Sequence, residues 1–287
     1  MSARIAVPVF PGTNSEDETV RLLRDCGGDA ELVHWSKAEE LALYDAFVLS
    51  GGFAYEDRIR AGAIAAHDRI MDYVMEAARC GKLVFGVCNG AQILLEAGLV
   101  PGTGSGRKPT AAFAKNLPEP HFVCRHVYLK LSIEPSRSAI TAALPHGALV
   151  PAWAAHAEGR LAAAPEHLKE IVEGDHLAFV YAHADGGVDD AAVPNGSALR
   201  CAGLVNRAGN VLAIMPHPER DAWNFNHLDR REGADVLAPS GGAVLFRSFV
   251  QAVSATQASH PEPRPEGASC HPEPRPEGAC RRTRASE

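Results

Sequence analysis

The stretch KLVFGVCNGAQILLEAG, residues 82–98, constrains the fold of this chain more than any other. A short apolar run ends at Gly86, a turn places Cys88 between two glycines, and an apolar helical pattern follows. The form glycine–x–nucleophile–x–glycine is typical of a sharp strand-to-helix turn, in which the glycines relieve crowding around a strained backbone. The N-terminus of the following helix favours the thiolate form of the cysteine. This context favours a nucleophilic Cys88 over a buried structural cysteine.

Strands and helices alternate through the first hundred residues. The pattern predicts a first helix that Asn14 or Ser15 can cap, because such side chains accept hydrogen bonds from the first backbone N–H groups. Alternating elements of this kind indicate an α/β fold with a doubly wound, mostly parallel sheet. The predicted strands cover residues 4–10, 30–35 and 46–52, and the predicted helices cover 14–28 and 59–79.

The middle of the chain, from about residue 120 to 215, is rich in β-forming segments. The runs HFVCRHVYLKLSI, HLAFVYAHA and NVLAIMPHP are separated by glycine turns such as those at 185–187 and 195–196. We expect antiparallel strands that extend or cap the parallel sheet. A last apolar helical pattern at 241–253 predicts the final helix.

The segment 254–287 has a different composition. It contains a direct repeat with a period of 11 residues, SHPEPRPEGA followed by CHPEPRPEGA, with three prolines in each copy and no large apolar residue. Such a segment cannot bury enough apolar surface to offset the entropy of ordering it. We therefore expect one folded domain over residues 1–253 and a disordered, proline-rich tail at 254–287.

Composition excludes several classes of protein. The net charge is −7 and no basic block precedes the extreme C-terminus, which disfavours a nucleic-acid partner. No apolar stretch is long enough to predict a membrane-spanning helix. The seven cysteines form no C-x-x-C pair, so no metal site is predicted. Their odd number, together with the lack of an export signal, fits the cytoplasm.

A thiolate nucleophile needs a proton shuttle, and the shuttle needs an orienting carboxylate. Among 13 histidines, His217 is the leading candidate, because an apolar strand ends just before it and prolines on both sides stiffen its turn. Glu219 is two residues further on and would share a side with His217 in an extended segment. A strand that ends in Gly51 and Gly52 could bring backbone N–H groups close to an oxyanion. A plain turn at 51–52 and a surface histidine at 217 are the alternatives.

At this point the chain resembles the class I, or triad, glutamine amidotransferases, which have a flavodoxin-like α/β fold. Within that family it is most similar to the glutaminase subunits of phosphoribosylformylglycinamidine synthases, which act in de novo purine synthesis. The matching motifs occur in family order and cover about residues 4–250. They are VFPGTNSEDET (9–19), GGFAYEDRIRAGAIA (51–65), GVCNGAQIL (86–94), HAEGR (156–160), PNGS (194–197) and MPHPER (215–220).

The resemblance implies a role for each matching residue. Cys88 would be the nucleophile, His217 the base and Glu219 its orienting partner. The oxyanion would be served by Gly52, Phe53 and Asn89, and Gln92 would lie beside the substrate. Three departures from the family pattern put details of substrate or partner contact in doubt; they are Glu56, Ala157 and Ser15.

The resemblance also implies a division of labour between chains. The glycine-rich segment 101–110 is not a phosphate loop, because Gly106 is followed by Arg107 before Lys108. ATP and Mg²⁺ are therefore expected on a large synthetase subunit, joined in the family by a small bridging subunit, with no cofactor in this chain. Two alternatives stay open: a stand-alone γ-glutamyl or amide hydrolase of the same fold, and a non-catalytic structural subunit.

Overall fold

The computed structural model describes residues 4–104, 108–228 and 233–258, and within them one nine-stranded sheet has the order β2-β1-β3-β4-β11-β10-β9-β6-β7. The first five strands in this order run parallel to one another, as expected for the doubly wound part. They are β2 (Asp29–His34), β1 (Arg4–Val9), β3 (Ala46–Leu49), β4 (Leu83–Val87) and β11 (Val211–Ile214). Strand β4 lies between β3 and β11 and is buried along its whole length, because sheet neighbours and helices cover it on all sides.

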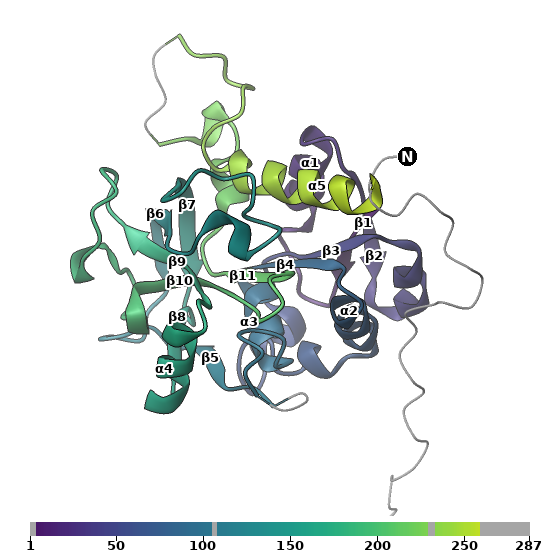
Figure 1. Cartoon of the computed structure of the whole chain (residues 1–287), viewed down its shortest axis with the longest axis horizontal. Coiled ribbons are helices and arrows are strands. Elements are labelled where there is room, and N and C mark those ends of the chain that lie inside the picture. Colours follow the sequence, from purple (N-terminus) through teal and green to yellow (C-terminus); the bar gives the residue numbers. More distant parts are fainter. Residues whose placement is uncertain (1–3, 105–107, 229–232, 259–287) are drawn as a thin grey trace, which may run out of the picture.

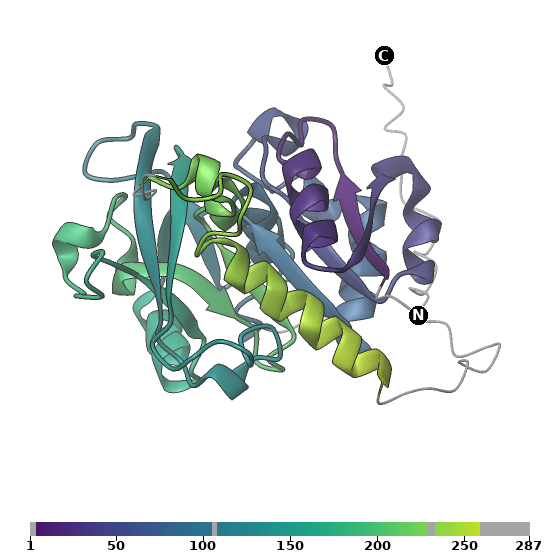
Figure 2. The same ribbon diagram turned by 90° about the horizontal axis from the view of Figure 1, so that it is seen from above.

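Helices cover both faces of this parallel part. Helices α1 (Glu16–Asp25) and α5 (Ala243–Ala258) lie on one face, and α2 (Arg69–Arg79) and α3 (Asn89–Glu96) lie on the other (Figure 1). Helix α5 runs diagonally across its face (Figure 2). Its rings anchor it there: the ring centroid of Phe85 in β4 lies 5.3 Å from that of Phe246 and 5.9 Å from that of Phe249. Burial of three aromatic rings makes this contact a main part of the core.

The expected antiparallel strands extend the sheet on the side of β11. They are β10 (Cys201–Val205), β9 (Leu177–Ala182), β6 (Val123–Leu131) and β7 (Leu149–His156), each antiparallel to its neighbours. A separate two-stranded sheet joins β5 (Ala111–Ala114) and β8 (Arg160–Ala163), and α4 (Pro165–Glu173) follows it. The run at 210–218 differs from the prediction, since β11 is parallel to β4 and antiparallel only to β10.

The edge strand of this extension returns to the parallel part. The backbone N–H of Trp153 in β7 donates to the carbonyl of His217, and the N–H of His217 donates to the carbonyl of Trp153, at 3.1 and 2.8 Å. His217 lies just beyond the carboxyl end of β11. The antiparallel strands therefore hold the turn that carries the candidate histidine.

The predicted helix at 59–79 is wrong in its first half. Helix α2 begins only at Arg69, where Asp68 caps it by accepting from the N–H of Ile70 at 3.0 Å. Upstream, Gly62 has φ +77° and lies against the backbone of Ile93, so that a side chain there would clash. Apolar spacing alone could not reveal this contact between distant segments.

Two other boundaries differ in detail. Ser15 stands at the N-cap of α1, but its side chain makes no capping bond and instead accepts from Arg220 at 2.8 Å. Helix α5 continues to Ala258, five residues beyond the expected end at Val253. The rest of the predicted tail, 259–287, lies outside the described residues. None of the described helices is long and apolar enough to cross a membrane.

Candidate active site

Cys88 occupies the predicted turn between β4 and α3. Its backbone has φ 51° and ψ −108°, a conformation rare for a residue with a side chain. Its N–H donates to the carbonyl of Ile214 in β11 at 2.8 Å, which fixes the turn to the sheet. Glycine is required at position 90, because a Cβ there would lie 2.0 Å from the carbonyl oxygen of Leu49. The turn thus holds the thiol, on a strained backbone, at the carboxyl edge of the parallel strands.

His217 and Glu219 form a buried pair next to this turn. Nδ1 of His217 lies 2.5 Å from Oε1 of Glu219, and the two side chains are 2% and 0% exposed. Pro218 begins the short 3-10 turn Pro218–Asp221 and fixes φ between the two residues. The predicted proximity of an imidazole and a carboxylate on one side of the chain is therefore present.

The thiol of Cys88 meets this pair. Its side chain is hydrogen-bonded to His217, and since Glu219 takes Nδ1, the other ring nitrogen is left for the sulfur. Burial opposes protonation of His217, but the charges of Glu219 and of the Cys88 sulfur prevail and raise the pKa of His217 to about 10. The contacts run from thiol to imidazole to carboxylate, which is the order that a nucleophile, a proton shuttle and an orienting carboxylate require.

Gly51 and Gly52 follow β3 and border the same site. A Cβ at Gly51 would lie 2.5 Å from Cε1 of His217, so only glycine allows the loop to pass this close to the imidazole. Gly52 pairs with Thr13 across an isolated bridge. The N–H of Phe53 already donates to the carbonyl of Gly12 at 2.8 Å, which leaves Phe53 unsuited to the oxyanion role expected of it. Asn89 has its N–H in the first turn of α3, where no intrahelical acceptor exists.

The side chain of Asn89 makes hydrogen bonds that the sequence did not predict. Its oxygen accepts from the N–H of Ala54 at 2.9 Å, and its amide nitrogen donates to Asp57 and to Gln92 at 3.1 and 2.9 Å. The amide of Gln92 in turn donates to the carbonyl of Glu158. Asn89 therefore ties the loop after Gly52 to the helix that follows Cys88.

One acid of this network, Asp57, has a shifted pKa. Burial and the nearby charge of Glu158 raise the pKa of Asp57 to about 6. The backbone from Tyr55 to Asp57, and again at Ile59, has positive φ at residues that are not glycine. Such a run costs conformational energy and persists only where surrounding contacts hold it. Glu56, a departure from the family pattern, lies in this run and is exposed, with its carboxylate 2.8 Å from Arg58.

His156 is a second histidine at the site, and it is not among the residues to which the family resemblance gives a role. It ends β7, is 4% exposed, and neither ring nitrogen has a hydrogen-bond partner among the described residues. Burial and the positive charge of His217 lower the pKa of His156 to about 4. The preceding residue, Ala155, has its carbonyl oxygen 3.8 Å from the Cys88 sulfur. Only its place in the HAEGR motif could have pointed to His156.

Comparison with known proteins gives the family of this chain. Residues 2–251 match the family model of the CobB/CobQ-like glutamine amidotransferase domain. The phosphoribosylformylglycinamidine synthase subunit PurQ of Symbiobacterium thermophilum is 39% identical over 86% of this chain and 96% of its own length. The PurQ subunit of Pyrococcus furiosus is 41% identical over 82% of this chain and 95% of its own length.

Solved structures show the same fold. A chain in the structure of PurLQS from Thermotoga maritima matches with a TM-score of 0.66 and 28% identity, over 88% of this chain and 99% of that one. A protein of Thermoplasma acidophilum described as a GMP synthase subunit also shares the fold. It matches with a TM-score of 0.54 and 20% identity, over 91% of this chain and 99% of that one. The chain therefore belongs to the family of PurQ subunits, the glutamine amidotransferase subunits of phosphoribosylformylglycinamidine synthase.

Proposed function

We propose that this chain hydrolyses glutamine through a thioester on Cys88 and delivers the ammonia to a large synthetase subunit. That subunit would convert phosphoribosylformylglycinamide to phosphoribosylformylglycinamidine with ATP. The observation that carries the proposal is the placement of His217 between the Cys88 thiol and the Glu219 carboxylate. Family membership supplies the substrate class and the acceptor reaction.

The reaction would proceed in two steps at Cys88. The sulfur attacks the side-chain amide carbon of glutamine, and backbone N–H groups of Gly52 and Asn89 hold the oxyanion. His217 gives its proton to the leaving nitrogen, ammonia departs and a γ-glutamyl thioester remains. Water, deprotonated by His217, then hydrolyses the thioester to glutamate. Glu219 holds the imidazole in place and balances its positive charge throughout.

The positions of the other candidate residues suggest their roles. Gln92 and Asn89 shape the floor of the site through their mutual hydrogen bond. Phe53, which is 48% exposed, would line the entrance and not donate to the oxyanion. We propose one catalytic domain over the family match, with its last helix running to Ala258.

The proposed partners follow from the relatives. PurQ is named as a subunit, and the similar Thermotoga maritima chain is part of a PurLQS structure. We place ATP and Mg²⁺ on the large synthetase subunit, with a small subunit bridging the two, and the complex in the cytoplasm. A closed route for ammonia between the two active sites would keep it unprotonated and nucleophilic.

Two nitrogen sources test the proposal. The chain is mixed with the large and small subunits, and amidation is measured with glutamine and separately with ammonium. Cys88→Ala should abolish glutamine-dependent amidation and leave ammonium-dependent amidation intact, because the ATP chemistry lies on another chain. Cys201→Ala, at a buried cysteine of β10 outside the Cys88–His217–Glu219 group, is the matched control and should retain both activities.

The same assay separates the alternatives. A stand-alone hydrolase would release glutamate at full rate without the synthetase and would not support amidation. A non-catalytic subunit would give no glutamine-dependent reaction in the wild type. Either result would overturn the proposed function.

A further inference from the structure

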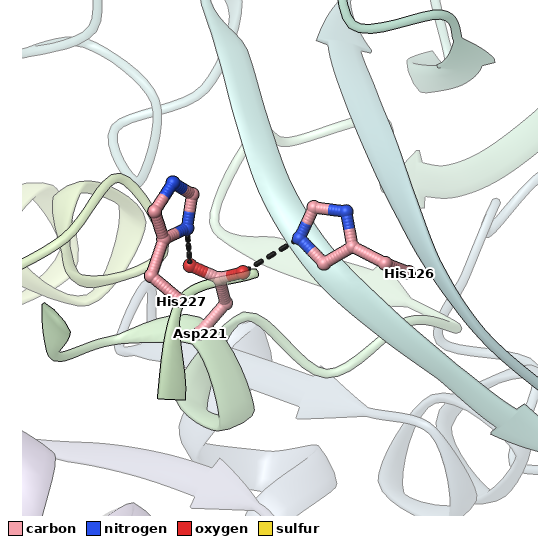
Figure 3. A group of neighbouring side chains, drawn as sticks. All are labelled: His126, Asp221 and His227. Atoms are coloured by element: carbon pink, nitrogen blue, oxygen red, sulfur yellow. Dashed lines mark hydrogen bonds and ion pairs between the residues drawn. The ribbon is translucent and has the colours of Figure 1, made fainter. Parts of the chain in front are cut away.

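Next to the turn Pro218–Asp221 lies a cluster of three side chains of the types that bind metal ions in proteins. His126 comes from β6, Asp221 ends the 3-10 turn Pro218–Asp221, and His227 follows a second short turn (Figure 3). Nε2 of His126 lies 2.6 Å from Oδ2 of Asp221, and Nδ1 of His227 lies 2.7 Å from Oδ1. One potential ligand atom from each residue lies within 4.8 Å of the other two.

We propose that these three residues form a binding site for a divalent late first-row transition metal, with Zn²⁺ as the principal candidate. Two imidazoles and one carboxylate suit zinc and its neighbours, whereas Mg²⁺ and Ca²⁺ prefer oxygen ligands alone. The site is independent of the glutaminase chemistry proposed above, and none of its residues belongs to the Cys88–His217–Glu219 group. The sequence alone does not indicate this cluster, because the two histidines are 95 and 6 residues from the aspartate.

The geometry allows entry of an ion with little movement. Ligand bonds of about 2.0–2.2 Å would bring the donor atoms to roughly 3.4 Å from one another. The ion would replace the protons now shared between the imidazoles and the carboxylate. The imidazole nitrogens that now lie 2.6 and 2.7 Å from carboxylate oxygens would move outward from them, and the donor atoms that are further apart, within 4.8 Å, would close around the ion. His227 provides this freedom and the path from solvent, since its side chain is 22% exposed, against 7% for His126 and 0% for Asp221.

The surroundings hold the ligands in orientation. The hydroxyl of Ser240 donates to Oδ1 of Asp221 at 2.8 Å, an outer contact of the kind that fixes ligating carboxylates. The ring of His126 packs edge-on against Tyr128 and Trp153, with centroids 5.0 and 5.4 Å away. With three protein ligands and one position toward solvent, a water molecule would complete a tetrahedral zinc site.

An ion here would join the active-site turn to the antiparallel strands. Asp221 closes the turn that contains Glu219, and Trp153, which packs on His126, pairs through its backbone with His217. Metal occupancy would therefore fix the catalytic turn against β6 and β7. It is expected to raise the thermal stability of the chain as well as to bind.

The test uses the full chain without an affinity tag, stripped of metal with a chelator. Calorimetric titration with ZnCl₂ should show one Zn²⁺ per chain, and Co²⁺ should give the visible absorption of a tetrahedral site. MgCl₂ should give no binding. His227→Gln and His126→Gln should each weaken Zn²⁺ binding by more than the roughly 10–100-fold that loss of an outer-shell partner causes. Zn²⁺ should raise the Tm of the wild type and not that of His227→Gln.

The control is His183→Gln, which removes the histidine of an exposed pair, since Nε2 of His183 also lies 2.8 Å from an aspartate oxygen, on Asp189. It should bind Zn²⁺ as the wild type does. Metal-free Tm and circular dichroism of His227→Gln identify any folding defect, and the Co²⁺ spectrum of His126→Gln then provides a second reading. The proposal is overturned if the wild type binds no stoichiometric Zn²⁺, or if both cluster variants bind it as tightly as His183→Gln.

Discussion

Nδ1 of His217 lies 2.5 Å from Oε1 of Glu219, and this contact is buried beside the only cysteine that the turn after β4 presents. The carboxylate opposes the effect of burial and, with the Cys88 sulfur, keeps the pKa of His217 at about 10. Glu219 therefore sets both the orientation and the charge of the imidazole.

Glu219→Gln should lower kcat/KM for glutamine by about 10²–10⁴-fold, less than loss of Cys88. Removal of the carboxylate charge lowers the pKa of His217, so the alkaline limb of the pH–rate profile should move from near pH 10 to lower pH. Steady-state kinetics between pH 6 and 10.5 provide the measurement. Glu18→Gln, which alters an acid paired with Arg220 in the same region, is the control and should leave the alkaline limb in place. An alkaline limb that does not move in Glu219→Gln would contradict the role of Glu219 as the partner of His217.

His156 makes a prediction about stability and pH. Its pKa is about 4 in the folded chain and about 6.5 when unfolded, so the unfolded state binds a proton first as pH falls. Folding stability should therefore fall by up to about 3 kcal/mol from this group between pH 6.5 and pH 4. His156→Gln should flatten the decline in the free energy of unfolding over that range, measured by urea denaturation at each pH. An equally steep decline in the variant would show that His156 does not titrate as described.

The left-handed residues at 55–57 and at Ile59 predict dependence on the partner. Ile59 has φ 74° and is 86% exposed, next to the loop that Asn89 ties to the nucleophile helix. A synthetase surface that covers this segment could select one arrangement of the loop. Glutaminase activity should rise about 10–100-fold in the complex with nucleotide and acceptor, or roughly 1.4–2.7 kcal/mol of coupling.

Ile59→Ser tests where this coupling enters. The variant should keep the low basal rate of the isolated chain but lose most of the stimulation by the synthetase. Leu43→Ser is the control, since Leu43 is also exposed, at 62%, but lies at the end of a different turn. If the isolated wild type already runs at the rate of the complex, the coupling does not exist and the stand-alone hydrolase gains support.

The proline-rich repeat predicts a tolerant C-terminus. Truncation after Ala258 keeps Gln257, whose side chain donates to Asp45 in the folded body. Because residues 259–287 offer no large apolar side chain to bury, Tm and glutaminase activity should be unchanged. Differential scanning calorimetry of the truncated and full chains makes the comparison, and a loss of several degrees would show that the repeat docks on the domain.

The fold was predictable where local patterns and chain order carried the information. The β4–Cys88–α3 turn follows from glycine positions and apolar runs, and family motifs placed His217 two residues before its carboxylate. Features built from distant segments were out of reach. Gly62 lies against the backbone of Ile93 in the segment before α2, where a longer helix was predicted. The hydrogen bond from the N–H of Phe53 to the carbonyl of Gly12 removes an expected oxyanion donor.

The same limit applies to side chains that meet only in the folded chain. His156 and Asp57 gain their shifted pKa values from burial and from charges brought together by the sheet and the loop after β3. The His126–Asp221–His227 cluster joins β6 to a turn far away in sequence. No spacing within a single motif encodes such contacts.

Trapping of the thioester would show whether Cys88 is the nucleophile. Glutamine is mixed with Glu219→Gln, in which hydrolysis of the intermediate should be slowed; the reaction is quenched in acid, and the protein is digested and examined by mass spectrometry. We expect a glutamyl adduct on the peptide that contains Cys88, and none when Cys88 is replaced by alanine in the same background. An adduct on Cys26, Cys124 or Cys201 instead, or continued glutamine hydrolysis by Cys88→Ala, would contradict it.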